Sequence, residues 1–122
     1  MTRFIPALGL ALLASTAAHA QAQAQAQFNG NWSVEVITEK GECDKAYRYP
    51  VVIQNGQVRY GGPEQFNASG SVQANGAVSG SISRGSDRAN VTGRLSGASG
   101  SGTWTAQGGR TCSGRWQAEK RG

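Results

Sequence analysis

The sequence has almost no histidine: among its 122 residues, His19 is the only one. Residues 1–20 have the parts of a secretory signal peptide, namely a positive charge at Arg3, a short apolar run and a small-residue cleavage site that ends at Ala20. Cleavage there removes the single imidazole. We therefore expect a mature chain without the side chain that most often serves as a general acid, general base or metal ligand.

Long apolar runs are also missing after the signal segment, so we expect no membrane span. Residues 21–27 read QAQAQAQ, an uncharged repeat that we interpret as a flexible spacer. Residues 28–122 are then predicted to form one small domain. Export places this domain in the periplasm or outside the cell.

Helical periodicity is absent from residues 28–122, where apolar and polar residues alternate with a period of two. This alternation predicts half-buried strands, separated by short turns rich in glycine, asparagine and serine. The expected strands cover residues 31–39, 47–54, 58–60, 66–72, 78–83, 90–95, 100–106 and 112–118. The predicted fold is all-β: an antiparallel up-and-down meander of about eight strands that closes into a small barrel and so removes exposed edges.

Two turns and one proline make this register specific. Asn55-Gly56 and Asn75-Gly76 are predicted to be tight two-residue hairpin turns with positive φ at both positions. Pro50 has no N–H to donate to a strand ladder, so we expect a bulge or a strand end there.

Glycine is abundant, and many glycines fall on the apolar face of the predicted strands. These inward glycines are Gly70, Gly80, Gly93, Gly100, Gly102 and Gly114, and the bulky residues predicted on the same face are Trp32, Trp104, Trp116, Tyr49, Tyr60 and Phe66. Small and large inward residues together suit a tight barrel. We expect the large side chains to fill the space that the glycines leave; the alternative is a hollow barrel.

Cysteine is scarce, with Cys43 after the first predicted strand and Cys112 at the start of the last. An antiparallel seam between these two strands brings the cysteines together. We therefore predict a Cys43–Cys112 disulfide, as expected for an exported chain.

Gly30-Asn31-Trp32, at the start of the first strand, resembles the G-x-W signature of the calycins, the lipocalin and avidin type of barrel. The resemblance implies that Gly30 and Trp32 are structural, that the tryptophan closes one barrel end, and that a basic residue from the last strand lies over it. The basic candidates are Lys120, Arg121 and Arg115. The segments Cys43–Tyr49 and Cys112–Trp116 also resemble a group of short exported alphaproteobacterial proteins, which implies location rather than chemistry.

Catalytic and metal sites are not indicated. Glu35 and Glu119 could face each other as the two carboxylates of a glycosidase, but their strand positions point outward, and we interpret them as surface charge. Without histidine, and with both cysteines used together, we expect no metal and no cofactor. Haem held by a tyrosine is the one alternative; it would use Tyr47, Tyr49 or Tyr60, with Arg48 or Arg59 for the propionates.

The charge excess is modest: the mature chain would carry eleven basic and seven acidic residues, a net charge of +4. The basic residues are dispersed, so we expect no nucleic-acid partner. The first functional hypothesis is a non-catalytic, monomeric interaction or structural module of the cell envelope. It would bind an envelope protein or a wall polymer, or act like an inhibitor by analogy of architecture. The alternative is a small apolar ligand, or haem, in the barrel interior, lined by Trp104, Trp116, Tyr49, Tyr60 and Phe66.

Overall fold

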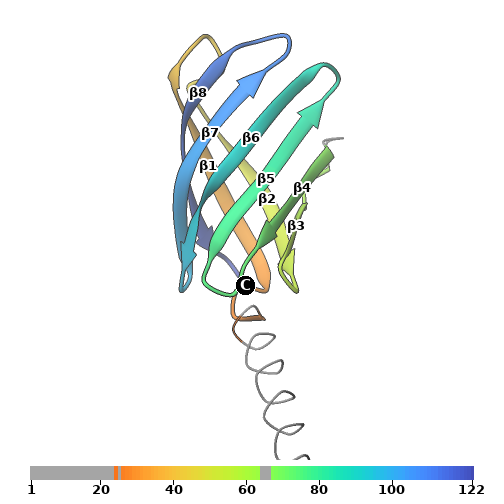
Figure 1. Cartoon of the computed structure of the whole chain (residues 1–122), viewed down its shortest axis with the longest axis vertical. Helices are drawn as coiled ribbons and strands as arrows, with labels where there is room; N and C mark the ends of the chain where they lie inside the picture. Colours follow the sequence, from red (N-terminus) through yellow and green to blue (C-terminus); the bar gives the residue numbers. More distant parts are fainter. Residues whose placement is uncertain (1–23, 25, 64–66) are drawn as a thin grey trace, which may run out of the picture.

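The computed structural model describes residues 24, 26–63 and 67–122, and these form a closed antiparallel barrel (Figure 1). The eight strands are β1 (Gly30–Lys40), β2 (Ala46–Gln54), β3 (Gln57–Tyr60), β4 (Asn67–Val72), β5 (Ala77–Arg84), β6 (Asp87–Ser96), β7 (Ser99–Gln107) and β8 (Cys112–Lys120). Each strand pairs with the next, and β8 pairs with β1. The predicted all-β meander barrel is confirmed. The predicted signal peptide lies outside the described residues, and within the predicted spacer Ala24 and Ala26 are helical.

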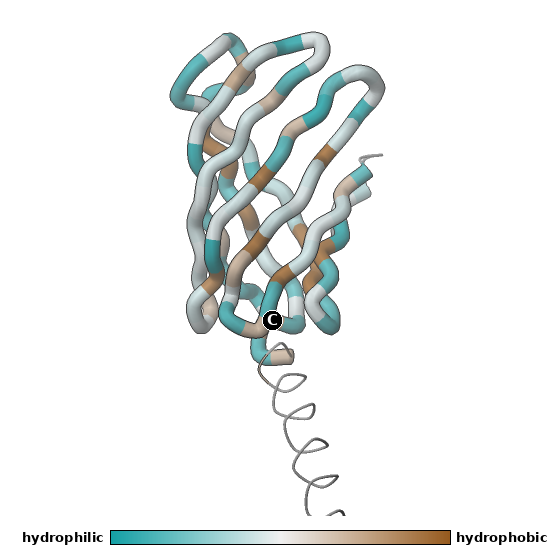
Figure 2. The backbone as a smooth tube through the Cα atoms, in the orientation of Figure 1, coloured by the Kyte–Doolittle hydropathy of each residue, from teal (hydrophilic) through white to brown (hydrophobic). Residues whose placement is uncertain are grey.

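The inward and outward faces follow the sequence alternation. Hydrophobic positions recur along the strands between polar ones (Figure 2), and among the described residues no polar or charged residue is buried. The buried core consists of Phe28, Trp32, Val36, Ile53, Val72, Leu95, Trp104, Cys112, Trp116 and Ala118. The inward and outward positions of the strands are therefore those that the two-residue period predicted.

The closing seam between β1 and β8 carries the predicted disulfide. Cys43, in the loop after β1, is bonded to Cys112 at the start of β8, with their Cα atoms 6.1 Å apart. The two cysteines are 69 residues apart in the sequence. On the chain-entropy model, a cross-link over a loop of this length adds about 4 kcal/mol to the free energy of unfolding. The disulfide prediction is confirmed.

The two asparagine–glycine turns differ. Asn55 and Gly56 both have positive φ, 52° and 79°, as a two-residue turn of the predicted kind requires. At the second turn only Gly76 has positive φ, 92°, and the Gly76 N–H donates to the Gln73 carbonyl, so the turn is centred on Ala74 and Asn75. The prediction of positive φ at Asn75 was wrong, because the Asn75 side chain instead accepts the Ala77 N–H and fixes a longer loop.

Pro50 also departs from expectation. It lies inside β2, and the register between β1 and β2 runs through it without a shift. The prediction of a bulge or strand end there was wrong, because the missing N–H faces away from β1, on the side where the pairing with β3 ends at Tyr60. The Pro50 carbonyl on that side accepts the Gly61 N–H at 2.9 Å. The register shift of β1 lies instead opposite β8, between Thr38 and Lys40.

The two ends of the barrel are built differently. One end, which we call the closed end, holds both the start of β1 and the end of β8 (Figure 1). It is filled by fully buried side chains, namely Phe28, Trp32, Ile53, Val72 and Leu95, each 4% exposed or less. The opposite end, which carries the disulfide and which we call the mouth, has half-buried residues at the inward positions of β2, β4 and β5.

The G-x-W segment lies at the closed end. Trp32 is 2% exposed, and its indole N–H donates to the Phe28 carbonyl at 2.9 Å. Lys120 is the β8 register partner of Trp32, and its Nζ donates to the Gln27 carbonyl. Arg115 is located elsewhere on β8, where it pairs with Glu39 at 3.5 Å. Lys120 is therefore the strand partner of the tryptophan, while Arg121 lines a surface pocket with Trp32 and pairs with Glu119.

Candidate ligand cavity in the barrel interior

The barrel interior contains a cavity of about 130 Å³. Its lining includes residues from every strand: Trp32, Val34, Val36, Tyr47, Tyr49, Val51, Ile53, Val58, Ala68, Gly70, Val72, Val78, Gly80, Ile82, Ala89, Val91, Leu95, Trp104, Trp116 and Ala118, together with Ser69, Ser79 and Ser81. The inward-facing members are apolar except for the phenolic groups of the two tyrosines. The expectation of a completely filled interior is therefore not met, and the reason lies in how the glycines are covered.

On one side of the barrel, tryptophan fills the space that glycine leaves. Gly93 and Gly102 are paired across β6 and β7. A Cβ atom on Gly93 would lie 2.5 Å from the Trp116 ring, and one on Gly102 would lie 2.6 Å from the indole nitrogen. The indole of Trp116 therefore packs directly on this glycine pair, as the sequence predicted.

On the adjacent strands β4 and β5, a second glycine pair has no indole among its nearest contacts. Gly70 and Gly80 are register partners across β4 and β5, and both line the cavity. A Cβ atom at either position would meet neighbouring backbone, the nearest contacts being 3.0 Å and 2.8 Å to carbonyl oxygens. The three nearest atoms at each position include no aromatic atom; at Gly70 the third is the Val58 Cβ, at 3.4 Å. The space over Gly70 and Gly80, which we call the cup, is the part of the interior left open.

The tryptophans have no polar group left to offer a ligand. The indole N–H of Trp104 donates to the Ile37 carbonyl at 3.1 Å, and that of Trp116 donates to the Thr92 carbonyl at 3.0 Å. No buried side-chain nitrogen or oxygen among the described residues lacks a partner. The inner wall of the cavity therefore favours an apolar occupant.

The mouth above the cup carries a cluster of tyrosines. The rings of Tyr47 and Tyr49 meet edge to face with centroids 5.1 Å apart, and Tyr49 meets Tyr60 at 6.1 Å. Burial raises the pKa of Tyr49, and a hydrogen bond with Tyr47 raises it further, whereas the same bond lowers the pKa of Tyr47, which burial raises overall.

The structure distributes the predicted cavity residues unevenly. Trp104, Trp116 and Tyr49 line the cavity. Tyr60 is not in the lining and contacts the ring of Tyr49 instead. Phe66 lies outside the described residues. The small members of the wall over Gly70 and Gly80, such as Val58 and Val91, were missed, although their inward position followed from the alternation.

The arginines considered for haem do not reach the cavity. Arg48 donates to Ser33 and Glu35 on the outer face of the barrel, and Arg59 donates to the Gln54 side chain there. The volume is also well below the roughly 300 to 1,000 Å³ of sites for larger ligands. The interior therefore does not fit a haem. In the described part of the chain no three histidine, cysteine or acidic residues are grouped as metal ligands.

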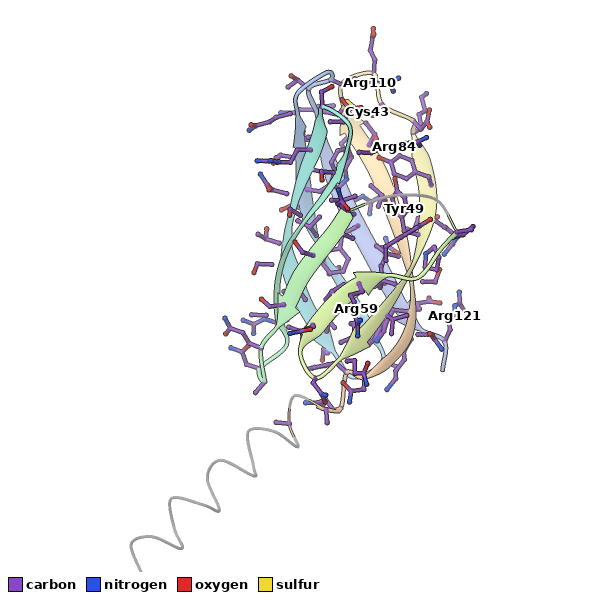
Figure 3. The ribbon with its side chains drawn as sticks, turned by 90° about the vertical axis from the view of Figure 1, so that its right-hand side faces the viewer. Cys43, Tyr49, Arg59, Arg84, Arg110 and Arg121 are labelled. Carbon is purple, nitrogen blue, oxygen red and sulfur yellow. A yellow bond between two sulfur atoms is a disulfide. The ribbon has the colours of Figure 1, made fainter. Side chains whose placement is uncertain are left out.

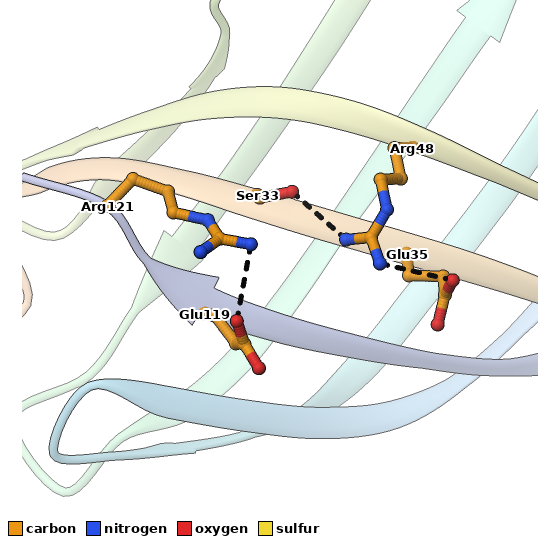
Figure 4. Close-up of polar contacts among 5 residues, drawn as sticks. All are labelled: Ser33, Glu35, Arg48, Glu119 and Arg121. Atoms are coloured by element: carbon orange, nitrogen blue, oxygen red, sulfur yellow. Dashed lines mark hydrogen bonds and ion pairs between the residues drawn. The ribbon is translucent and has the colours of Figure 1, made fainter.

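The outward carboxylates form ion pairs rather than a catalytic dyad (Figure 4). Glu35 pairs with Arg48 at 3.4 Å, and Glu119 pairs with Arg121 at 3.3 Å. Glu119 lies opposite Ser33, not opposite Glu35, in the register of the two strands. Their arrangement is that of exposed surface charge, which contributes little to stability.

Comparisons with protein-family models, with curated proteins and with solved structures find no match for this chain. No helix in the described ranges is long and apolar enough to cross a membrane. Function must therefore be argued from the cavity itself, because a barrel of this kind does not by itself define one.

Proposed function

We propose that this protein is a non-catalytic binding protein that holds one compact apolar ligand inside its barrel. The observation that carries the proposal is the glycine pair Gly70 and Gly80, which lines the cavity and has no aromatic atom among its nearest contacts, whereas the neighbouring pair packs against Trp116. A barrel built only for stability gains from filling its interior, because unfilled space forfeits packing contacts.

The size of the cup limits the ligand. An engineered apolar cavity of about 150 Å³ stays dry and takes up benzene or xenon. The cavity here, about 130 Å³, is similar in volume and in lining. The ligand is therefore a single six-membered ring or a short branched alkyl group.

Catalysis has no support in the cavity. Among the described residues its inward surface carries no carboxylate, lysine or thiol, and Ser69, Ser79 and Ser81 belong to the outward-facing series of β4 and β5. The proposal includes export of the mature chain and a calycin-like relationship, which rests on Trp32 at the closed end with Lys120 as its strand partner.

Titration of the mature protein with toluene, followed by isothermal calorimetry and by NMR of inward methyl groups, tests the proposal. We expect saturable binding of one toluene and weaker or no binding of naphthalene. Val91 lines the cavity and is the strand partner of Gly80, so Val91→Phe fills the cup and Val91→Ala enlarges it. Phenylalanine should abolish toluene binding, and alanine should retain it and admit naphthalene. A folded wild-type protein that binds neither probe would contradict the proposal.

An interaction module is the second candidate, and one feature of β2 favours it. Among the described strands only β1 pairs with Ala46–Pro50, because β3 pairs with β2 from Val51 onward. An exposed strand edge can accept an added strand from a partner. The main-chain N–H of Arg48 faces this edge, because the Ser33–Pro50 pair cannot be hydrogen-bonded and alternate residues share an orientation.

A pull-down from periplasmic or culture extract compares the wild type with Arg48→Pro, which removes the edge donor, and with Arg48→Gln, which keeps it. A partner that pairs with the β2 edge should be lost with proline and retained with glutamine. Equal capture by both variants would exclude this mode of binding.

A further inference from the structure

We propose that the outer face of β5, β6 and β7 binds an anionic glycan strand, that is, a sugar polymer that carries carboxylates at intervals. This inference concerns the outside of the barrel and does not depend on a ligand in the cavity. It is argued from the outward side chains of β6 and from the hydroxyl groups that the strand register places beside them.

The outward face of β6 alternates with the cavity lining. Ala89 and Val91 line the cavity, so the residues between them point away from the interior. Figure 1 shows β5, β6 and β7 side by side in this part of the wall. We use the name polar strip for the following outward residues: Arg88, Asn90, Thr92 and Arg94 of β6, Ser79 and Ser81 of β5, and Thr103 and Thr105 of β7.

The middle of the polar strip consists of short polar side chains in two rows across the sheet. The members of each row are strand partners: Ser79, Thr92 and Thr103 in one row, and Ser81, Asn90 and Thr105 in the other. Adjacent strands are about 4.8 Å apart, so these groups form a continuous patch. In the described part of the chain, the side chains of the β6 and β7 members form no hydrogen bond. They can therefore donate and accept hydrogen bonds with a ligand.

An arginine lies at each end of the polar strip. Arg88 and Arg94 are both exposed and are six residues apart on β6, which is about 20 Å of extended strand. Among the described residues, their side chains have no ion pair or hydrogen bond, whereas Arg48, Arg115 and Arg121 each pair with a glutamate. Two guanidinium groups are thus available to the anionic groups of a ligand.

This face has no acidic side chain to compete with such a ligand. The outward positions of the described strands β5, β6 and β7 contain no aspartate or glutamate. Asp87 belongs to the alternate series of β6, and its Oδ1 accepts the Gly109 N–H at 3.1 Å. Glu119, opposite Ser99 on β8, pairs with Arg121. The electrostatic character of the polar strip therefore favours an anion.

The composition of the strip favours a glycan over other anionic partners. Single-stranded nucleic acid binds through aromatic stacking and a basic groove that follows the backbone, and the outward positions of these strands contain no aromatic residue. Anionic lipid surfaces attract dense basic clusters, whereas the two arginines here are far apart. A chain of hydroxyl-bearing rings matches the two polar rows, and widely spaced carboxylates match the planar donor forks of the two arginines.

Titration of the disulfide-bonded protein with three oligomers of similar length tests the inference. The probes are a hyaluronan oligosaccharide, which carries a carboxylate on alternate sugars, a neutral chitin oligosaccharide, and single-stranded DNA. We expect hyaluronan to bind most tightly. Its affinity should fall as salt is added, because ion pairs between exposed groups are screened.

Variants of the polar strip separate its two parts. Arg88→Gln and Arg94→Gln should each weaken hyaluronan binding severalfold, and together they should weaken it at least about tenfold and reduce its salt dependence. Thr92→Val combined with Thr103→Val removes two central hydroxyls without a change in charge, so it should weaken binding by the same factor at every salt concentration. The matched control is Arg59→Gln, which removes one charge from β3, on the side of the barrel that faces the viewer in Figure 3.

Four results would overturn the inference. An equal loss of hyaluronan affinity in Arg59→Gln and in Arg88→Gln would show an effect of net charge alone. Equal affinity for the chitin oligosaccharide would remove the role of the arginines, and tighter binding of DNA would assign the face to nucleic acid. A wild type that does not bind hyaluronan would contradict the inference outright. Toluene binding in the cavity should be the same in all these variants, so its failure would contradict the proposed function and not this inference.

Discussion

Replacement of Trp116 by alanine tests whether the filled half of the barrel is core or binding site. Trp116 is 4% exposed, packs on Gly93 and Gly102, and donates its N–H to the Thr92 carbonyl. Large-to-small substitutions of this kind cost about 3 to 5 kcal/mol. A domain of this size has a free energy of unfolding of roughly 5 to 14 kcal/mol, so the loss is a large part of the total.

Guanidinium denaturation of the disulfide-bonded protein, followed by circular dichroism, measures this loss. A decrease of 4 kcal/mol corresponds to a midpoint shift of about 1 M for a small domain. Trp116→Phe is the matched control: it keeps most of the packing and loses the hydrogen bond, so it should cost about 1 to 2 kcal/mol. Added indole should stabilise Trp116→Ala more than the wild type, because it binds only the folded variant with the vacated space. A loss below 1 kcal/mol for Trp116→Ala would refute the assignment of this residue to the core.

Further predictions concern the turns, the disulfide and the tyrosines. Gly76→Ala should lower the free energy of unfolding by clearly more than 1 kcal/mol, because the new Cβ would contact the Leu95 carbonyl oxygen. Gly85 also has positive φ, but a Cβ there would have nothing within 4 Å, so Gly85→Ala should cost about 1 kcal/mol. Equal losses of unfolding free energy in the two variants, measured by denaturation, would contradict this geometry. The unfolded, non-reduced mature protein should have no titratable thiol, and reduction should lower the free energy of unfolding by about 4 kcal/mol; two free thiols by Ellman assay would refute the cross-link. Because burial raises the pKa of Tyr47 and Tyr49, the stability that depends on their neutral forms is present below pH 10 and should be lost as the pH rises above it. In a titration followed at 295 nm, Tyr49→Phe should remove the step at highest pH, and an unchanged curve would contradict the assignment.

The sequence predicted the barrel because every strand repeats the same two-residue period and every connection is short. The disulfide followed from topology, since an even number of antiparallel strands places the end of β1 beside the start of β8. These features depend on local pattern and strand order alone. They needed no knowledge of how side chains fill the interior.

The cup could not be predicted in the same way, because it depends on which tryptophan covers which glycine. Gly70, Gly80, Gly93 and Gly102 look equivalent in the sequence, yet only the last two have an indole atom among their nearest contacts. The prediction for the turn at Asn75-Gly76 was wrong for a related reason, since the Asn75 side chain accepts the backbone N–H of Ala77.

Diffraction from crystals of the mature protein pressurised with xenon tests the central claim most directly. Xenon occupies dry apolar cavities of this size. Our account predicts one strong xenon peak inside the barrel, bounded by Val58, Gly70, Gly80 and Val91, and its loss in Val91→Phe. A wild-type barrel with side chains packed over Gly70 and Gly80, and no xenon between them, would contradict it.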